Sequence, residues 1–296
     1  MQISFLLWRT FDRMLRLVAR LSVVLLLTPQ SWAVIYEVGP GHTLQKLSSV
    51  PWASLHPGDT VNIHYQPDGY HEIILLSNSG ATNAPVTING VPDPDTGMLP
   101  TLDGQNAVTA TNAAWSDPSL HPQGIIVVSR EAHQPYGYIP SWVVIQNLHV
   151  QNADPSQTLT QSDGTARSFD NSASAIYVEY AQHLVIRGCE LNNSCNGVFC
   201  GSKNNDPNQL SADVLIEHSW IHDNGYPNNY EAANVGTECA GVVLNSTASD
   251  RCAPAPGAIK SRIVLQAPCS AIVKSLTALG LARLSGSPKL RTLRGL

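Results

Sequence analysis

The sequence has few aromatic residues (6%) and few charged residues (13%), although 43% of its 296 residues are apolar. An apolar share of this size excludes a disordered chain, because disordered chains have too little apolar surface to form a core. Glycine and proline are frequent instead, with 21 and 20 copies. This composition is typical of an all-β protein rich in turns.

Motifs that indicate a particular chemistry are also absent. The sequence contains no Cys-x-x-Cys pair, and its ten histidines show no spacing typical of zinc ligands. It has neither a glycine-rich phosphate loop nor a nucleophile elbow. Between Val34 and Asp250 it carries 21 acidic residues and five basic ones. We therefore expect no nucleic-acid partner.

Residues 1–33 have the pattern of a secretory signal peptide. Four arginines within residues 9–20 precede an apolar run at 21–27, and small residues follow at Ser31 and Ala33. An uncleaved anchor is the alternative, but the apolar run is too short to cross a bilayer comfortably. We expect a secreted or periplasmic protein, without stable membrane insertion, that begins near Val34.

Six cysteines would then meet an oxidising compartment. Cys189, Cys195 and Cys200 are close in sequence and could pair with one another or with Cys239. They could equally be small apolar residues of the core. The sequence leaves both alternatives open.

A repeated pattern is the main positive signal. Three segments, beginning at Trp142, His183 and Asp213, each combine an apolar run, one further apolar position and a polar step with asparagine. The matched apolar positions are Ile145, Ile186 and Ile216, then Val150, Leu191 and Ile221. The matched asparagines, within one place of register, are Asn152, Asn193 and Asn224. No helical period runs through these segments, so they predict short strands.

Strands this short bury an apolar face only by stacking on the next coil, which predicts a solenoid over residues 34–243. Asparagine at the turns tolerates left-handed backbone geometry. We expect residues 93–121 and 154–173 to form polar loops on one flank. An apolar stripe with Leu47 and Trp52 predicts a short helical cap before the first strand.

The early segments also resemble a known family. "VGPGHTLQKL", "HPGDTVNIHYQPDGYHEIILLSNSG", "APVTINGVP" and "LPTLDGQNA" are similar to the opening of secreted right-handed parallel β-helix proteins of the pectate-lyase-like superfamily, in the bacterial polysaccharide-degrading group. The resemblance covers roughly residues 38–243. It implies an all-β, right-handed parallel β-helix and a polysaccharide substrate, with a monomer as the expected state.

The composition changes after Val243. Residues 251–296 contain eight Lys or Arg and no Asp or Glu. One interpretation of the atypical tail at 244–296 is a basic segment for anionic partners. The other is a shifted reading frame, which we favour. Starting each codon one base earlier lets synonymous codons for the segment from Leu244 spell "QFNRFGPLRAGAWGNQVKDRSAG", which is similar to a further coil of the same family.

The most polar stretch, Ile216 to Glu238, holds the predicted site. Its predicted catalytic residues are His222, Tyr230 and Glu231. Its predicted substrate contacts are Asp223, Asn224, Tyr226 and Asn234. Turn roles for Asp223 and Asn224, and a solvated strand edge for His222, are the alternatives.

Two chemistries fit these residue types. A lyase needs a base to remove the proton beside a uronate carboxylate, and a cation such as Ca²⁺ or arginine to neutralise that carboxylate. A glycoside hydrolase needs two carboxylates, here Asp223 and Glu231. We rank it lower, because the signatures of β-helix polygalacturonases are absent. We therefore expect a lyase-like enzyme acting on an acidic polysaccharide, with Ca²⁺ as its possible cofactor. If the frame is shifted after Val243, we expect this chain to be truncated and inactive. The alternative is a non-catalytic carbohydrate-binding or cell-surface protein.

Resequencing the gene across the Val243 codon tests the shifted frame. We expect an inserted or deleted base near that codon and, once the frame is restored, a further coil with acidic and basic residues mixed. An unchanged sequence through codon 296 would contradict this prediction.

Overall fold

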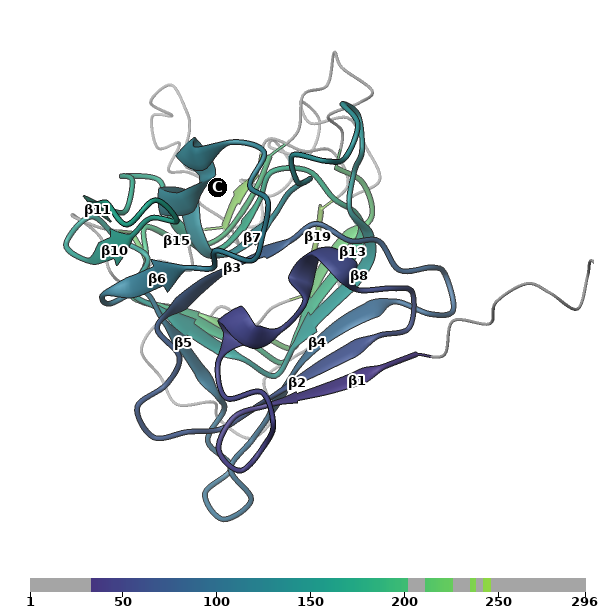
Figure 1. Cartoon of the computed structure of the whole chain (residues 1–296). Helices are drawn as coiled ribbons and strands as arrows, with labels where there is room; N and C mark the ends of the chain where they lie inside the picture. Colours follow the sequence, from purple (N-terminus) through teal and green to yellow (C-terminus); the bar gives the residue numbers. More distant parts are fainter. Residues whose placement is uncertain (1–32, 202–210, 226–234, 238–241, 246–296) are drawn as a thin grey trace, which may run out of the picture. The chain divides into compact units, whose positions relative to one another are not determined.

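The computed structural model describes residues 33–201, 211–225, 235–237 and 242–245, all within one compact unit that begins at Ala33. Its elements are β-strands and three short 3₁₀ helices, η1 (Leu47–Ser49), η2 (Trp52–Ser54) and η3 (Pro118–Gln123) (Figure 1). None of the helices in these ranges has the length and apolar character needed to cross a membrane. The predicted all-β class is confirmed.

The strands form three sheets. Sheet A is parallel and contains, in spatial order, β1 (Ile35–Val38), β2 (Thr60–His64), β4 (Val86–Val91), β8 (Ser141–Gln146), β13 (Gln182–Arg187), β16 (Val214–Glu217) and β19 (Val242–Asn245). Sheet B is also parallel and contains β17 (Trp220–Ile221), β14 (Glu190–Asn192), β9 (His149–Gln151) and β5 (Thr101–Asp103). Sheet C contains β11 (Ala166–Ser168), β10 (Thr158–Thr160), β6 (Ala107–Thr109), β3 (Glu72–Leu76), β7 (Gly124–Val128), β12 (Ser174–Val178), β15 (Asn196–Cys200) and β18 (Val235–Thr237). Only the β10–β11 pair of the described strands is antiparallel.

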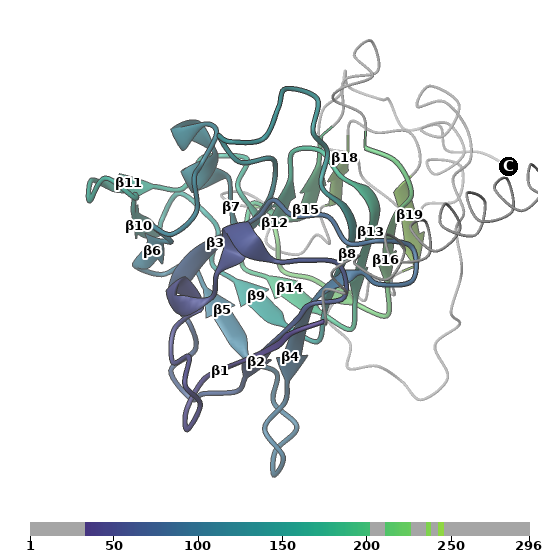
Figure 2. The same ribbon diagram turned by 45° about the vertical axis from the view of Figure 1, so that its right-hand side comes forward.

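The chain visits the sheets in turn. From β12 onward, consecutive strands belong to sheets C, A, B, C, A, B, C and A. Figure 2 shows the strands of each sheet side by side in succession, with the three sheets around a common interior. The predicted boundary after Val243 falls inside β19, which pairs with β16 through Asn245.

Matched apolar residues pack directly on one another, as the repeat predicted. Ile186 is in register with Ile145 on one neighbouring strand and with Ile216 on the other. Leu191 is likewise in register with its two counterparts in sheet B, Val150 and Ile221. All six side chains are at most 1% exposed. Burying a branched aliphatic side chain contributes about 1.5–3 kcal/mol, so this interior is the main source of stability.

The corners between sheets use left-handed backbone geometry. After three of the four sheet B strands, β9, β14 and β17, the corner residue has a positive φ: 68° at Asn152, 47° at Asn193 and 50° at Asp223. The two asparagines lie where the repeat placed them, but Asp223 and not Asn224 takes the third corner. Asparagine and aspartate tolerate this conformation because their short polar side chains bond locally.

The outer face of sheet A carries a directional ladder of polar side chains. Each side chain of the ladder donates a hydrogen bond to the next, over distances of 2.8–2.9 Å. The order, from first donor to last acceptor, is Arg187, Gln146, Asn89, Asn62 and the Glu37 carboxylate. Hydrogen bonds from His64 and Asn62 lower the pKa of Glu37. The ladder therefore runs from a cationic donor to an anionic acceptor and fixes the register of five strands.

Of two expectations about the flanking segments, the short helical cap is confirmed and the loops need correction. The N-terminal cap consists of 3₁₀ turns, in which Trp52 donates to the Leu47 carbonyl at 2.7 Å and the Glu72 carboxylate accepts from Leu47 and Ser48. The predicted loop at 93–121 contains β5 and β6, and the one at 154–173 contains the β10–β11 hairpin. These strands are only three residues long, so no alternating pattern marks them.

The cysteines follow the second alternative where they are described. Cys189, Cys195 and Cys200 are buried, and no disulfide joins any two of these three described residues. Burial raises the pKa of the Cys189 thiol to about 12. Burial, with the charge of Asp154, does the same for Cys195. Both thiols therefore stay protonated and inert near neutral pH. Cys239 lies outside the described residues.

Replacing Ile186 tests the stacked interior. We expect Ile186→Ala to lower the free energy of unfolding by about 2–5 kcal/mol, because it leaves a cavity between two other isoleucines. The adjacent Val185 points outward, and Val185→Ala should cost about 0.5 kcal/mol. Denaturant unfolding of both variants compares the two sites, and equal losses would contradict the stack.

Candidate functional site

Polar side chains gather on the outer face of sheet B, where the strands lie in register. One row crosses the sheet through Thr101, His149, Glu190 and Trp220. A second row runs through Asp103, Gln151 and Asn192, and continues to His222, whose N–H donates to Leu191 of the neighbouring strand. Alternation along each strand sends these side chains away from the core. The sheet thus presents acids, imidazoles and amides on one surface.

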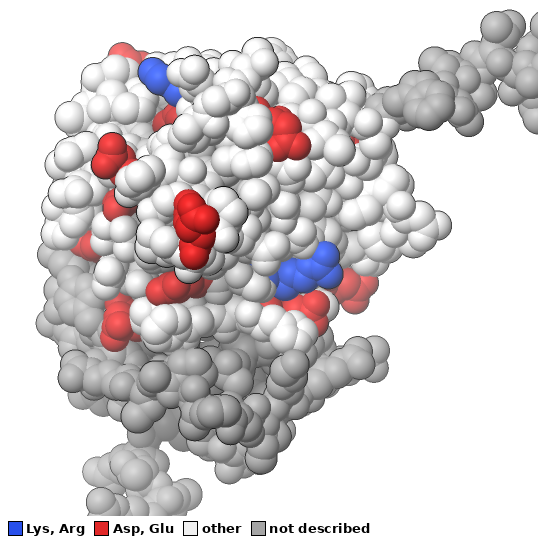
Figure 3. All heavy atoms as spheres, turned by 90° about the horizontal axis from the view of Figure 1, so that it is seen from below, with Lys and Arg blue, Asp and Glu red and all other residues white. Residues whose placement is uncertain are grey.

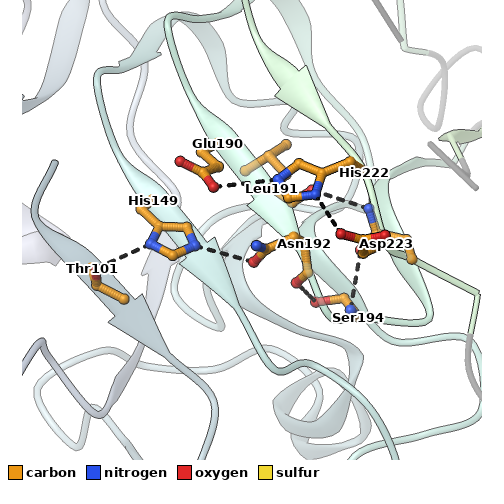
Figure 4. Close-up of polar contacts among 9 residues, drawn as sticks. Thr101, His149, Glu190, Leu191, Asn192, Ser194, His222 and Asp223 are labelled. Atoms are coloured by element: carbon orange, nitrogen blue, oxygen red, sulfur yellow. Dashed lines mark hydrogen bonds and ion pairs between the residues drawn. The ribbon is translucent and has the colours of Figure 1, made fainter. Parts of the chain in front are cut away.

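His222 is the centre of this surface (Figure 4). Its Nδ1 lies 2.8 Å from a carboxylate oxygen of Asp223, and its Nε2 lies 3.3 Å from one of Glu190. Its side chain is 11% exposed. A neutral imidazole donates from one nitrogen only, whereas the doubly protonated ring donates to both carboxylates. The arrangement therefore places a carboxylate acceptor beside each nitrogen of the ring.

A second histidine lies one strand further across the sheet. His149 Nδ1 is 3.2 Å from the Thr101 hydroxyl, and its Nε2 is 3.1 Å from the Asn192 side-chain oxygen. Figure 4 shows the two imidazoles on either side of Asn192 and Glu190. Both rings of His149 and His222 are thus held in fixed orientations by their neighbours.

An aromatic ring borders the histidine. Trp220 stacks on His222 with ring centroids 3.7 Å apart and is 40% exposed. Large apolar side chains this exposed are few among the described residues. A half-exposed indole beside hydrogen-bonding groups suits the apolar face of a sugar ring.

Asp223 and Asn224 have different roles. The Asp223 side chain is partly exposed and contacts His222, so it stays a candidate for the site. Asn224 is fully buried: its oxygen accepts from the Ser194 N–H and its nitrogen donates to the Leu191 carbonyl, both at 3.0 Å. This favours a structural role for Asn224 over the predicted substrate contact.

Four predicted site residues belong to segments that the structure does not describe. Tyr226, Tyr230, Glu231 and Asn234 lie outside the described residues. Their catalytic and substrate-binding roles stay predictions.

The predicted Ca²⁺ finds no complete set of ligands on the described part of sheet B. Asp103 is already engaged, since one oxygen accepts from Gln151 and the other from Asn152 and the Gln105 N–H. Glu190 and Asp223 lie on opposite sides of an imidazole. Within the described ranges, three converging metal-binding side chains occur only elsewhere, on sheet A. A Ca²⁺ ion at sheet B would need oxygen ligands from residues outside those ranges.

The charge of the described surface is mainly negative. Figure 3 shows one face on which acidic side chains clearly outnumber basic ones. An anionic polymer would therefore need a cation to approach such a face.

Residues that the sequence patterns did not single out complete the site. Glu190, His149 and Trp220 each directly precede a matched apolar position of the repeat, namely Leu191, Val150 and Ile221. The alignment of the repeat could therefore have identified these three residues. Each stands just before a matched apolar position, so their side chains form one outward-facing row.

Comparisons with known proteins give no family. No family model matches the chain, and no curated protein matches it. Among solved structures, the crystal structure of Escherichia coli YbhC aligns with a TM-score of 0.41 and 11% identity, over 74% of this chain and 56% of YbhC. The aligned part thus spans little more than half of that protein.

Proposed function

We propose that this protein is a secreted or periplasmic right-handed parallel β-helix that cleaves an acidic polysaccharide by a lyase-type reaction. The observation that carries the proposal is the His222 imidazole held between Asp223 and Glu190, on an outward sheet face beside a half-exposed tryptophan.

The order of the strands supports the solenoid part of the proposal. From β12 onward the chain contributes strands to the three sheets in a fixed rotation, and neighbouring strands within each sheet pair in parallel. Parallel connections of this kind are right-handed in nearly all proteins. An outward face of such a coil is an extended surface of the kind that suits a polymer.

The contacts of His222 suit proton abstraction. With Nδ1–H donated to Asp223, Nε2 is left to take the proton beside the uronate carboxylate. The electron pair left by the broken carbon–hydrogen bond then forms a carbon–carbon double bond. The carbon–oxygen bond of the leaving sugar breaks with its electron pair on the oxygen, which takes up a proton from solvent. Glu190, next to Nε2, stabilises the imidazolium.

The predicted partners of His222 complete this scheme. Tyr230 and Glu231 are proposed to assist proton transfer, and Tyr226 and Asn234 to contact the sugar. Ca²⁺ would supply the positive charge that neutralises the substrate carboxylate.

Non-catalytic carbohydrate binding is the second candidate. It is favoured by the fact that both nitrogens of His222 already contact carboxylates and that its side chain is largely buried. In that case the Asp223–His222–Glu190 contacts hold the sheet face in shape, and Trp220 provides the sugar platform.

Incubation with pectate and alginate, with and without Ca²⁺, separates the two candidates. We expect rising ultraviolet absorbance from unsaturated chain ends, and a loss of at least about 100-fold in His222→Ala, because a positioned base contributes this much.

His183→Ala is the matched control, since His183 also stacks on a tryptophan, Trp142, and contacts an aspartate, Asp213. It should keep wild-type activity. Binding without product would favour the non-catalytic candidate, and equal activity in both variants would exclude His222 as the base.

A further inference from the structure

Three metal-binding side chains converge at the first strands of sheet A, away from the sheet B site. Glu37 lies in β1, His64 ends β2 and His42 lies in the loop that follows β1. One ligand atom from each lies within 4.8 Å of the other two. Two imidazoles with one carboxylate form a ligand set that suits Zn²⁺.

We propose that Glu37, His42 and His64 form a binding site for a divalent transition metal, with Zn²⁺ as the best fit. Imidazole nitrogens favour Zn²⁺ and its transition-metal neighbours over Ca²⁺ and Mg²⁺, which prefer oxygen ligands. Three protein ligands leave one position of a tetrahedral ion for water.

Backbone pairing places the two strand residues. Glu37 is in register with Asn62. Asn62 lies two residues before His64, so the two side chains point to the same side of β2. The Glu37 carboxylate lies 2.6 Å from His64 Nε2 and accepts from Asn62 through its other oxygen at 2.9 Å. Asn62 therefore orients the carboxylate, as partners of metal ligands commonly do.

The loop brings in the third ligand. The His42 ring stacks on the His64 ring with centroids 4.0 Å apart. The loop is closed by hydrogen bonds from Gly39 N–H to the Leu44 carbonyl and from His42 N–H to the Gly39 carbonyl. Gly39 must be glycine here: its φ is 134°, and a Cβ would meet the Tyr70 hydroxyl at 2.7 Å. The loop is thus built to lie against His64.

Small side-chain movements complete the site. Ligand nitrogens and oxygens of tetrahedral zinc lie roughly 3.3 Å apart, as follows from metal–ligand distances of about 2.0–2.1 Å. The three side chains are half-buried, so they can close this gap while the backbone stays in place. The ion replaces any proton between His64 and Glu37, which is released. It would join β1, the edge strand of sheet A, to the loop and to β2.

Zinc titration of the purified full-length protein, stripped with a chelator, tests the site. We expect calorimetry to detect one Zn²⁺ that is lost in H42A/H64A, no comparable binding of Ca²⁺ at this site, and a higher melting temperature with Zn²⁺ in the wild type. The matched control is H183A/H218A, which removes two other partly exposed histidines and should keep the zinc site.

The single variant H42A serves as a second test that leaves the strands intact, because His42 lies outside them. With circular dichroism unchanged, its zinc affinity should fall at least about tenfold. Absence of zinc binding in the wild type, or equal affinity in the wild type and H42A/H64A, would overturn the proposal. The second result would assign the ion to thiols or to other histidines.

Discussion

The stacking of inward-facing branched side chains, in register from strand to strand, is the constraint on which the rest of the structure depends. Ile145, Ile186 and Ile216 occupy one such row. Because side chains alternate along a strand, a shift of one residue would turn this row outward and bring polar side chains into the core. The buried row therefore fixes the register of the outward rows as well.

Both candidate sites are consequences of that register. On sheet B it sets Glu190 beside His149 and Trp220, so His222 finds a carboxylate on the neighbouring strand. On sheet A it aligns Glu37 with Asn62. The hydrogen bond from Asn62 then orients the Glu37 carboxylate toward His64. Strand pairing thus brings together functional groups that are far apart in sequence, and the loop after β1 adds His42.

The sequence predicted what repeats and missed what occurs once. Ile145, Ile186 and Ile216 could be aligned because each lies five residues before another apolar position. Asn224 was expected at a corner but lies one position after it. In the repeat segment that begins at Asp213, Asp223 takes the corner and the following asparagine is buried. The cluster of Glu37, His42 and His64 matches no motif, since strand pairing and a closed loop bring its members together. The three-residue strands β5 and β6 were too short to show alternation.

Disulfide trapping tests the register most directly. Val144 and Val185 are partners on neighbouring strands of sheet A and are both partly exposed. Paired residues on adjacent strands have Cα atoms close enough for a disulfide. Strands two places apart in the sheet are separated by roughly 9.6 Å, which is too far. The stacked register predicts that V144C/V185C forms a disulfide, located by peptide mass spectrometry, and that V144C/L215C, on alternate strands, does not. Failure of the first pair to cross-link in the folded protein, or cross-linking of the second, would contradict it.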